Sequence, residues 1–279
     1  MKESHALDGL VEPVNKYIQD PLAQWMVEYL KHTEITPNQV TYFSVLTGFA
    51  SGYAFSFSNS LASTLGGLLL EITLLLDCVD GQLARTKGLA SKWGRLIDGI
   101  AGYFAYLAVV WGIIEGFPEH AQTLKVIGAL VIMRAISYDY CKQSLGTLIL
   151  KGYDGMEREI QNTRQRVERE MSWVLVIYFY YMQVQQLFFR GKWTFLHQVK
   201  TVNMNGEPEL TAVQRIGSFK KVKVLLWIWS WNGLDLPLFL LALFAILGIL
   251  SSSLIPFLYV MSVQFLLTLM AHYYFVRKV

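Results

Sequence analysis

Six apolar stretches dominate this sequence and favour a fold inside a membrane. A helix needs roughly 20 mainly apolar residues to cross a bilayer. We therefore predict six transmembrane helices, at Val40–Phe57, Leu61–Asp77, Leu96–Ile114, Val126–Cys141, Val224–Leu250 and Leu254–Val276. Only 16% of the residues are charged, against about 25% in a soluble domain. The chain is therefore expected to be an all-α integral membrane protein, neither disordered nor an ordinary soluble enzyme.

Two further helices are expected at the membrane surface. Between Asp20 and Lys31, one helical face carries Leu22, Trp25, Met26, Tyr29 and Leu30, a pattern typical of an amphipathic helix in the interface plane. The apolar stretch Trp173–Phe189 is interrupted by three glutamines, so we interpret it as an interfacial or partly buried helix. The N-terminal residues carry charges throughout and do not resemble a signal peptide.

The basic residues predict the orientation in the membrane. With six spans, three loops would share one side of the membrane, near Phe57–Ser60, Glu115–Lys125 and Ser251–Ser253. Of the 24 lysines and arginines, only Lys125 falls in these loops, and Arg134 lies within the fourth span. Because basic residues favour the cytoplasmic side, we predict that both termini are cytoplasmic, in a bacterial or archaeal cytoplasmic membrane.

The spans divide the chain into four predicted segments. They are an interfacial segment at 1–35, spans one to four at 36–141, a cytoplasmic insertion at 142–223 and spans five and six at 224–279. Within the insertion, Asn205-Gly206 between two alternating runs predicts a hairpin, either a lid for the site or a surface decoration. Trp227, Trp229 and Trp231 are interpreted as an aromatic belt at the membrane surface.

Two acids, Asp77 and Asp80, stand where the second predicted span ends. Three residues apart on a helix, they share a face, and Asp98 on the next span could converge on them. Ionisable groups at membrane depth are functional candidates by default, and carboxylates favour a hard cation such as Mg²⁺ or Mn²⁺. The spacing leaves open that the acids merely pair with nearby basic residues, which are Arg85, Lys87, Lys92 and Arg95.

Small residues and an arginine accompany these acids. Gly81 directly follows Asp80, and Gly94 lies one turn before Asp98, so each leaves room for a ligand near the backbone. Arg85 lies one turn past Gly81 and can bind a phosphate through two nitrogens. This combination favours a diphosphate site, at which a cation neutralises the diphosphate and polarises the phosphorus under attack.

The chain resembles the CDP-alcohol phosphotransferases, whose signature is D-x2-D-G-x2-A-R-x8-G-x3-D-x3-D. The matching residues, all at the correct spacing, are Asp77, Asp80, Gly81, Ala84, Arg85, Gly94 and Asp98. Thr36-Pro37-Asn38 also looks like the family's entry to its first span. Independently of that likeness, Thr36-Pro37 is typical of a helix N-cap followed by proline at the first helical position.

The resemblance implies a six-span enzyme, usually a homodimer, with a polar site open to the cytoplasm. There, two divalent cations bind the diphosphate of a CDP-alcohol, most commonly CDP-diacylglycerol, an acceptor hydroxyl displaces CMP, and a phospholipid-type product forms. The metal ligands would be Asp77, Asp80 and Asp98. Contacts to the donor would come from Gly81, Ala84, Arg85, Gly94, Ser91, Asn38 and Thr41.

The chain departs from the signature at its last position, where Gly102 replaces an aspartate that ligates metal and is the family's proposed base. Losing a general base costs roughly 10²–10⁴ in rate. Three explanations are open. Asp139 or Asp235 substitutes for it, the acceptor needs little help or carries its own base, or the chain binds CDP-alcohol and metal without turnover.

Other polar residues support weaker interpretations. Arg134, within the fourth span, must face protein or a cavity and binds either the acceptor or a buried acid; Lys142 also borders the expected acceptor site. An ion-coupled transporter is the remote alternative, but no internal repeat supports it. We expect membrane lipid as a partner and no nucleic acid, and Cys78 and Cys141 are expected to be reduced thiols.

Overall fold

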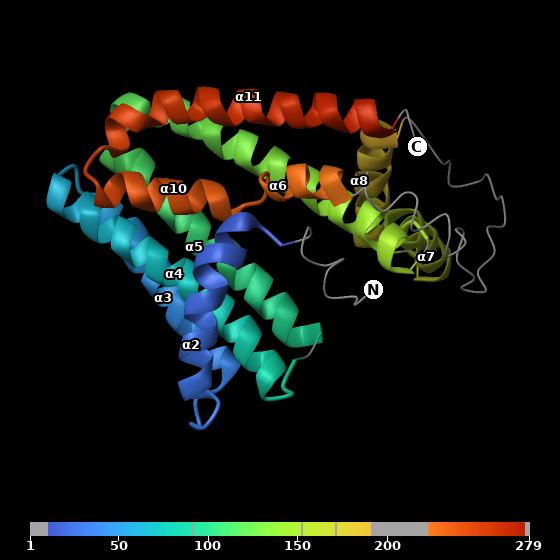
Figure 1. Ribbon diagram of the computed structural model, residues 1–279, viewed down its shortest axis with the longest axis horizontal. Helices are drawn as coiled ribbons and strands as arrows, with labels where there is room; N and C mark the ends of the chain where they lie inside the picture. Colours follow the sequence, from blue (N-terminus) through green and yellow to red (C-terminus); the bar gives the residue numbers. More distant parts are fainter. Residues whose placement is uncertain (1–10, 91, 152, 171, 191–222, 277–279) are drawn as a thin grey trace. The chain divides into compact units, whose positions relative to one another are not determined.

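The computed structural model describes residues 11–90, 92–151, 153–170, 172–190 and 223–276 (Figure 1), and within them the regular structure is entirely helical. The prediction of an all-α chain is confirmed for these residues. The elements with defined bounds are η1 (Asn15–Gln19), α2 (Asp20–Leu30), α3 (Pro37–Phe55), α4 (Ser60–Thr86), α5 (Lys92–Gly116), η2 (Pro118–His120), α6 (Ala121–Lys151), α7 (Gly155–Glu170), α8 (Trp173–Arg190), α10 (Asp235–Ile246) and α11 (Leu250–Val276).

The chain forms two compact units, which we describe one at a time. The motif unit comprises Glu12–Met133 and Gly233–Val263, and it contains the signature residues. Among its described residues, the second unit contains the remainder of α6 from Arg134, helices α7 and α8, and the end of α11 from Gln264. The division therefore falls inside two long helices.

Helix α3 lies at the centre of the motif unit and packs antiparallel to α4 and parallel to α5 (Figure 1). Helix α3 begins with the predicted cap: the Thr36 hydroxyl accepts from the Gln39 backbone N–H, and the Gln39 side chain accepts from the Thr36 N–H. Helices α3 and α5 approach backbone to backbone, because a Cβ at Gly112 would lie 1.9 Å from the carbonyl oxygen of Gly52. Only glycine permits this crossing.

A large apolar core closes one end of the motif unit. Its buried members include Phe55, Leu74, Val109 and Leu241, from four different helices. A second cluster joins Ala23 and Val27 of α2 to Val79 and Leu83 of α4. Burial of this kind contributes about 25 cal/mol per Å² of apolar surface, so α2 is anchored to the helix that carries the signature.

The prediction that α2 has one apolar face at the membrane surface is confirmed only in part. Leu22, Trp25 and Tyr29 are exposed, as an interfacial helix requires. Met26 and Leu30, which were predicted to share that face, instead pack against the cluster with α4. The helix is therefore amphipathic with its inner face on the protein.

The second unit buries an unusual number of polar side chains. Gln183 and Gln186 of α8 and Thr163 of α7 are each at most 2% exposed. Trp229 is fully buried and donates a hydrogen bond of 3.2 Å to Nδ1 of His272. Trp229 therefore does not belong to a surface aromatic belt, and that prediction was wrong for this residue.

Helix bounds differ from the predicted spans in several places; α6, for example, runs from Ala121 to Lys151 and not from Val126 to Cys141. Helix α4 continues past Asp77 to Thr86, because Val79 and Leu83 extend its apolar face against α2. The fifth predicted span is not one helix: residues 223–230 are helical, a turn follows, and α10 begins at Asp235. The Asn232-Gly233 step accounts for the break, since glycine and asparagine favour turns.

Among the described residues, three helices are long and apolar enough to cross a membrane. They are Ser60–Thr86, Leu250–Tyr274 and the stretch Lys223–Ile246 taken together across its turn, and they correspond to the second, sixth and fifth predicted spans. The other three predicted spans lie on α3, α5 and α6, which are helical but are not among these three; the part of α5 whose side chains are described, Phe104–Gly116, is a shorter apolar helix. The predicted hairpin around Asn205-Gly206 lies outside the described residues.

Candidate active site

Helix α4 carries the first part of the signature in its last turns. Asp77, Asp80 and Gly81 are all helical, so the two acids share a face, as their spacing predicted. Asp77 is half-buried, whereas Asp80 is only 3% exposed. A buried carboxylate requires compensating hydrogen bonds or a cation, and the structure shows one such bond.

That hydrogen bond comes from the entry of α3. The Thr41 hydroxyl lies 2.5 Å from Oδ2 of Asp80 and 3.2 Å from the Pro37 carbonyl oxygen. Hydrogen bonds to charged groups are the stronger class, so the hydroxyl fixes the orientation of Asp80. Thr41 was predicted to contact the donor, and the structure places it on a signature carboxylate. Asn38, its predicted companion, is exposed on the first turn of α3.

Gly102 faces the signature acids from the neighbouring helix. A Cβ built at position 102 would lie 3.8 Å from Oδ1 of Asp77 and 3.8 Å from Cε2 of Tyr106. These are ordinary contact distances, so a larger residue would fit. Position 102 therefore lies beside Asp77 and has no side chain of its own.

Gly81 and Arg85 lie together one turn further along α4. A Cβ at Gly81 would be 3.6 Å from Nη1 of Arg85, whose side chain is exposed. The Arg85 guanidinium thus lies over Gly81, on the same face of α4. Ala84 is half-buried beside them. An exposed guanidinium at a small-residue surface suits an incoming phosphate.

Helix α5 carries the rest of the signature. Gly94 and Asp98 lie on it, but their side chains are outside the part of the structure that is described, as is Ser91 altogether. Among the described side chains, no three of the His, Cys, Asp and Glu residues form a group able to hold a metal. Asp77 and Asp80 therefore represent two of the three predicted ligands, and both supply hard oxygen donors suited to Mg²⁺ or Mn²⁺.

Sequence reasoning missed two contacts that fix the signature helix. Gln82 donates to Oδ1 of Asp20 at 2.8 Å, and Lys87 donates to the carbonyl oxygens of Thr33 and Ile35 at 2.7 and 2.8 Å. Both join α4 to α2 or to the α2–α3 loop. No spacing rule could have found them, because the partners lie about 50–60 residues apart in the chain.

Asp235, a predicted substitute for the missing aspartate, belongs to the motif unit. Its carboxylate accepts a hydrogen bond of 2.6 Å from Nδ2 of Asn15, and its backbone N–H donates to Oε2 of Glu12 at 3.0 Å. The Glu12 carboxylate lies directly on Gly233, where a Cβ would overlap it at 1.9 Å. Asp235 is therefore part of a clasp between the N-terminal segment and the start of α10.

The other predicted polar residues belong to the second unit. The Arg134 side chain is fully buried, and its Nη2 donates to the Trp231 carbonyl oxygen and to Oε1 of Gln264, at 2.8 and 2.6 Å. Lys142 lies 5.4 Å from the centre of the Tyr138 ring, and Asp139 is exposed. Their roles in acceptor binding or base catalysis stay predictions.

The arrangement defines a helical membrane protein that presents two carboxylates, a glycine and an arginine at the end of a long apolar helix. A family model described as CDP-alcohol phosphatidyltransferase matches residues 34–195. The chain belongs to this family and is a phosphatidyltransferase-type enzyme of phospholipid synthesis. Its family generally uses divalent metal ions, and the transporter alternative loses its support.

Three relatives show how the match is distributed. An archaetidylinositol phosphate synthase of Pyrococcus horikoshii is 29% identical over 146 residues, which are 50% of this chain and 73% of that protein. Bifunctional IPC transferase and DIPP synthases of Aquifex aeolicus and Archaeoglobus fulgidus are 30% and 38% identical over 107 residues, 37% of this chain. The chain spans about a quarter or less of these two bifunctional proteins.

Proposed function

We propose that the protein transfers a lipid-bearing phosphate from a CDP-linked lipid, with CDP-diacylglycerol the expected donor, to the hydroxyl of a small acceptor. In this reaction the acceptor oxygen forms a bond to the phosphorus that carries the lipid. The bond from that phosphorus to the CMP oxygen breaks, and CMP leaves. The observation that carries the proposal is the position of Gly102 on α5 against Asp77 on α4, because it joins the two halves of the signature.

Asp77, Asp80 and Asp98 would hold the divalent cations, in a site for one or two ions. The donor set supports this assignment, since the acids offer only hard oxygen ligands. When bound, the cations would neutralise the diphosphate of the donor. Thr41 keeps the Asp80 carboxylate in place through its hydroxyl, so the protein does not have to reorganise this ligand.

The donor would lie over the surface formed by Gly81, Ala84 and Arg85. The Arg85 guanidinium is exposed beside Gly81, so it can pair with phosphate oxygens in a bidentate geometry. Gly94, Ser91 and Asn38 are further predicted contacts to the donor. These residues would bind and orient the nucleotide, and holding the donor in a fixed orientation lowers the free-energy barrier to transfer.

The acceptor would supply the base that Gly102 does not. The gap at position 102 faces the Asp77 carboxylate and leaves room for an acceptor. The name of the Pyrococcus horikoshii relative, archaetidylinositol phosphate synthase, supports a phosphorylated polyol as acceptor. Its phosphate can take the proton of the attacking hydroxyl, so a protein carboxylate is not required at this position.

The topology we propose has six spans, with the signature on the cytoplasmic side and a homodimer as the assembly. The alternating direction of α3, α4 and α5 supports the span order, because it puts the signature at one end of the helices and the α3–α4 turn at the other. The end that carries the signature also carries Arg85 and Lys87, which the positive-inside rule assigns to the cytoplasm.

An assay of CMP release tests the proposal. Full-length protein is incubated with Mn²⁺ or Mg²⁺, CDP-diacylglycerol or another CDP-alcohol, and either myo-inositol or inositol phosphate. We expect release only with metal, and much faster release with the phosphorylated polyol. Release no greater than that of Asp77→Asn, with every pair of substrates, would overturn the proposal that the chain catalyses this transfer.

A further inference from the structure

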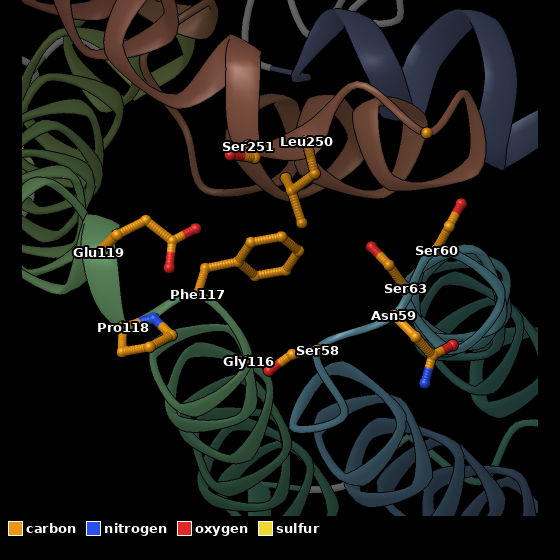
Figure 2. A pocket seen from close by; sticks show the side chains of 11 residues that line it. Ser58, Asn59, Ser60, Ser63, Gly116, Phe117, Pro118, Glu119, Leu250 and Ser251 are labelled. Atoms are coloured by element: carbon orange, nitrogen blue, oxygen red, sulfur yellow. The ribbon is translucent and has the colours of Figure 1, made fainter.

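A hollow with both polar and apolar side chains in its lining lies at the start of α4, whereas the signature acids lie near the end of that helix. Figure 2 shows the hollow from close by. Its volume is about 370 Å³, within the roughly 300–1,000 Å³ of small-molecule sites. It is lined by the α3–α4 turn, the end of α5 with η2, and the turn between α10 and α11. At about 1.5 Å per residue of helix, Ser60 in this hollow is roughly 26 Å from Asp77 along α4. The hollow is thus separate from the candidate active site.

Ser63 marks the hollow as more than a gap between turns. Its side chain is only 5% exposed, and its hydroxyl has no hydrogen-bond partner among the described residues. Figure 2 shows this hydroxyl directed toward the middle of the hollow, on the side of Phe117 and Leu250. The hydroxyl opens into the hollow, so it can donate to or accept from a ligand there in place of water.

The charge of the lining selects the kind of ligand. Glu119 is the one ionisable side chain that lines the hollow among the described residues, and its carboxylate points inward (Figure 2). The ring of Phe117 lies between Glu119 and Ser63 in the same view, and an aromatic face attracts cations. Helices α4 and α11 begin here while α3, α5 and α10 end nearby, so their helix dipoles oppose one another. The Glu119 carboxylate therefore makes the electrostatic potential in the hollow negative.

The rim of the hollow is held in place by a histidine. Nε2 of His120 lies 2.8 Å from the Ser251 hydroxyl and 3.9 Å from Oε1 of Glu119. This contact joins η2 to the first turn of α11, two of the three segments that line the hollow. The Glu119 carboxylate therefore lies on a segment, η2, that a hydrogen bond fixes to α11.

We propose that this hollow binds a primary ammonium group, which pairs with the Glu119 carboxylate, lies against the Phe117 ring and donates to the Ser63 hydroxyl. The ammonium can come from a lipid head group or from a free amine, and the chemistry of recognition is the same. The hollow lies where apolar helices end, beside buried Phe55 and Leu250, a position that a lipid head group can reach. This site does not depend on the reaction at the signature acids.

Ligand-detected NMR with ethanolamine tests the proposal on the full-length protein in detergent. We expect saturable binding that Glu119→Gln weakens at least tenfold and Ser63→Ala weakens several-fold. Glu115→Gln is the matched control, because Glu115 is exposed near the same helix end but does not line the hollow. Metal-dependent CMP release and the unfolding temperature, measured on each variant, establish that the variants are folded.

Native mass spectrometry from nanodiscs distinguishes the two sources. Retention of phosphatidylethanolamine over phosphatidylglycerol with the same acyl chains, lost in Glu119→Gln, identifies a lipid head group. Binding of ethanolamine alone identifies a free amine. The proposal is overturned by no binding in either experiment, by equal loss in Glu115→Gln, or by ethylene glycol competing as well as ethanolamine.

Discussion

The Thr41 hydroxyl lies 2.5 Å from the buried Asp80 carboxylate, and this pair joins the first turns of α3 to the signature helix. Hydrogen bonds to charged groups contribute roughly 1.5–3 kcal/mol. We therefore expect Thr41→Val to lower CMP release about tenfold or more and to raise the Mn²⁺ concentration needed for half-maximal rate. The shift in metal requirement separates this role from a general loss of stability.

Thr41→Ser is the matched control, because it keeps the hydroxyl and removes only a methyl group. It should behave like the natural protein in both measurements. A Thr41→Val variant with unchanged rate and unchanged metal requirement would show that Asp80 does not depend on this contact.

The crossing of α3 and α5 predicts a strong effect of one added methyl group. Because a Cβ at Gly112 would lie 1.9 Å from the Gly52 carbonyl oxygen, Gly112→Ala forces the two helices apart. Overpacking of this kind typically costs about 1–3 kcal/mol, so the unfolding temperature in detergent should fall by several degrees. Gly128→Ala is the control, since nothing lies within 4 Å of a Cβ there; an equal fall in both variants contradicts the close crossing.

Asp235 should matter for structure and not as the base. Its carboxylate is bonded to Asn15, and Asp235→Asn keeps an oxygen that can accept this bond. We expect CMP release to fall less than tenfold, whereas removal of a general base costs roughly 10²–10⁴. Asp139→Asn is measured alongside it, and a loss of a hundredfold in either variant would identify a carboxylate that replaces the one missing at Gly102.

The proposed topology predicts which residues a membrane-impermeant maleimide can reach. In a Cys78→Ala, Cys141→Ala background, Gln122→Cys at the start of α6 should react in intact cells. Glu34→Cys, before α3, should react only after the membrane is opened. Both positions are exposed in the structure, so the difference reports the side of the membrane. Labelling of both in intact cells, or the reverse order, contradicts the topology.

Much of the fold and the site could be predicted because apolar length and signature spacing are local properties. Thr36-Pro37 marked the start of α3, where Thr36 is the N-cap and Pro37 the first helical residue, as predicted. The spacing of Asp77 and Asp80 put them on one face of a helix, which α4 confirms. Family membership followed from seven residues within a short segment and is confirmed by the match to residues 34–195.

The remainder depends on contacts between distant parts of the chain. Helix α4 runs beyond Asp77 because α2 packs on Val79 and Leu83, and no local pattern reports that partner. The fifth span was predicted as one helix, and neither its break at Asn232-Gly233 nor the Glu12 carboxylate on the Asp235 N–H was predicted. Trp229 was misjudged because composition cannot tell a tryptophan at the membrane surface from one buried against His272.

Metal-dependent CMP release by the natural chain, Asp77→Asn and Gly102→Asp, compared with myo-inositol and inositol phosphate, tests the central claim most directly. We predict that the natural chain uses the phosphorylated acceptor at least 100-fold faster, that Asp77→Asn is inactive with both, and that Gly102→Asp gains activity with myo-inositol. Equal release from the natural chain and Asp77→Asn with inositol phosphate, the preferred acceptor, would contradict the assignment of the signature acids to catalysis.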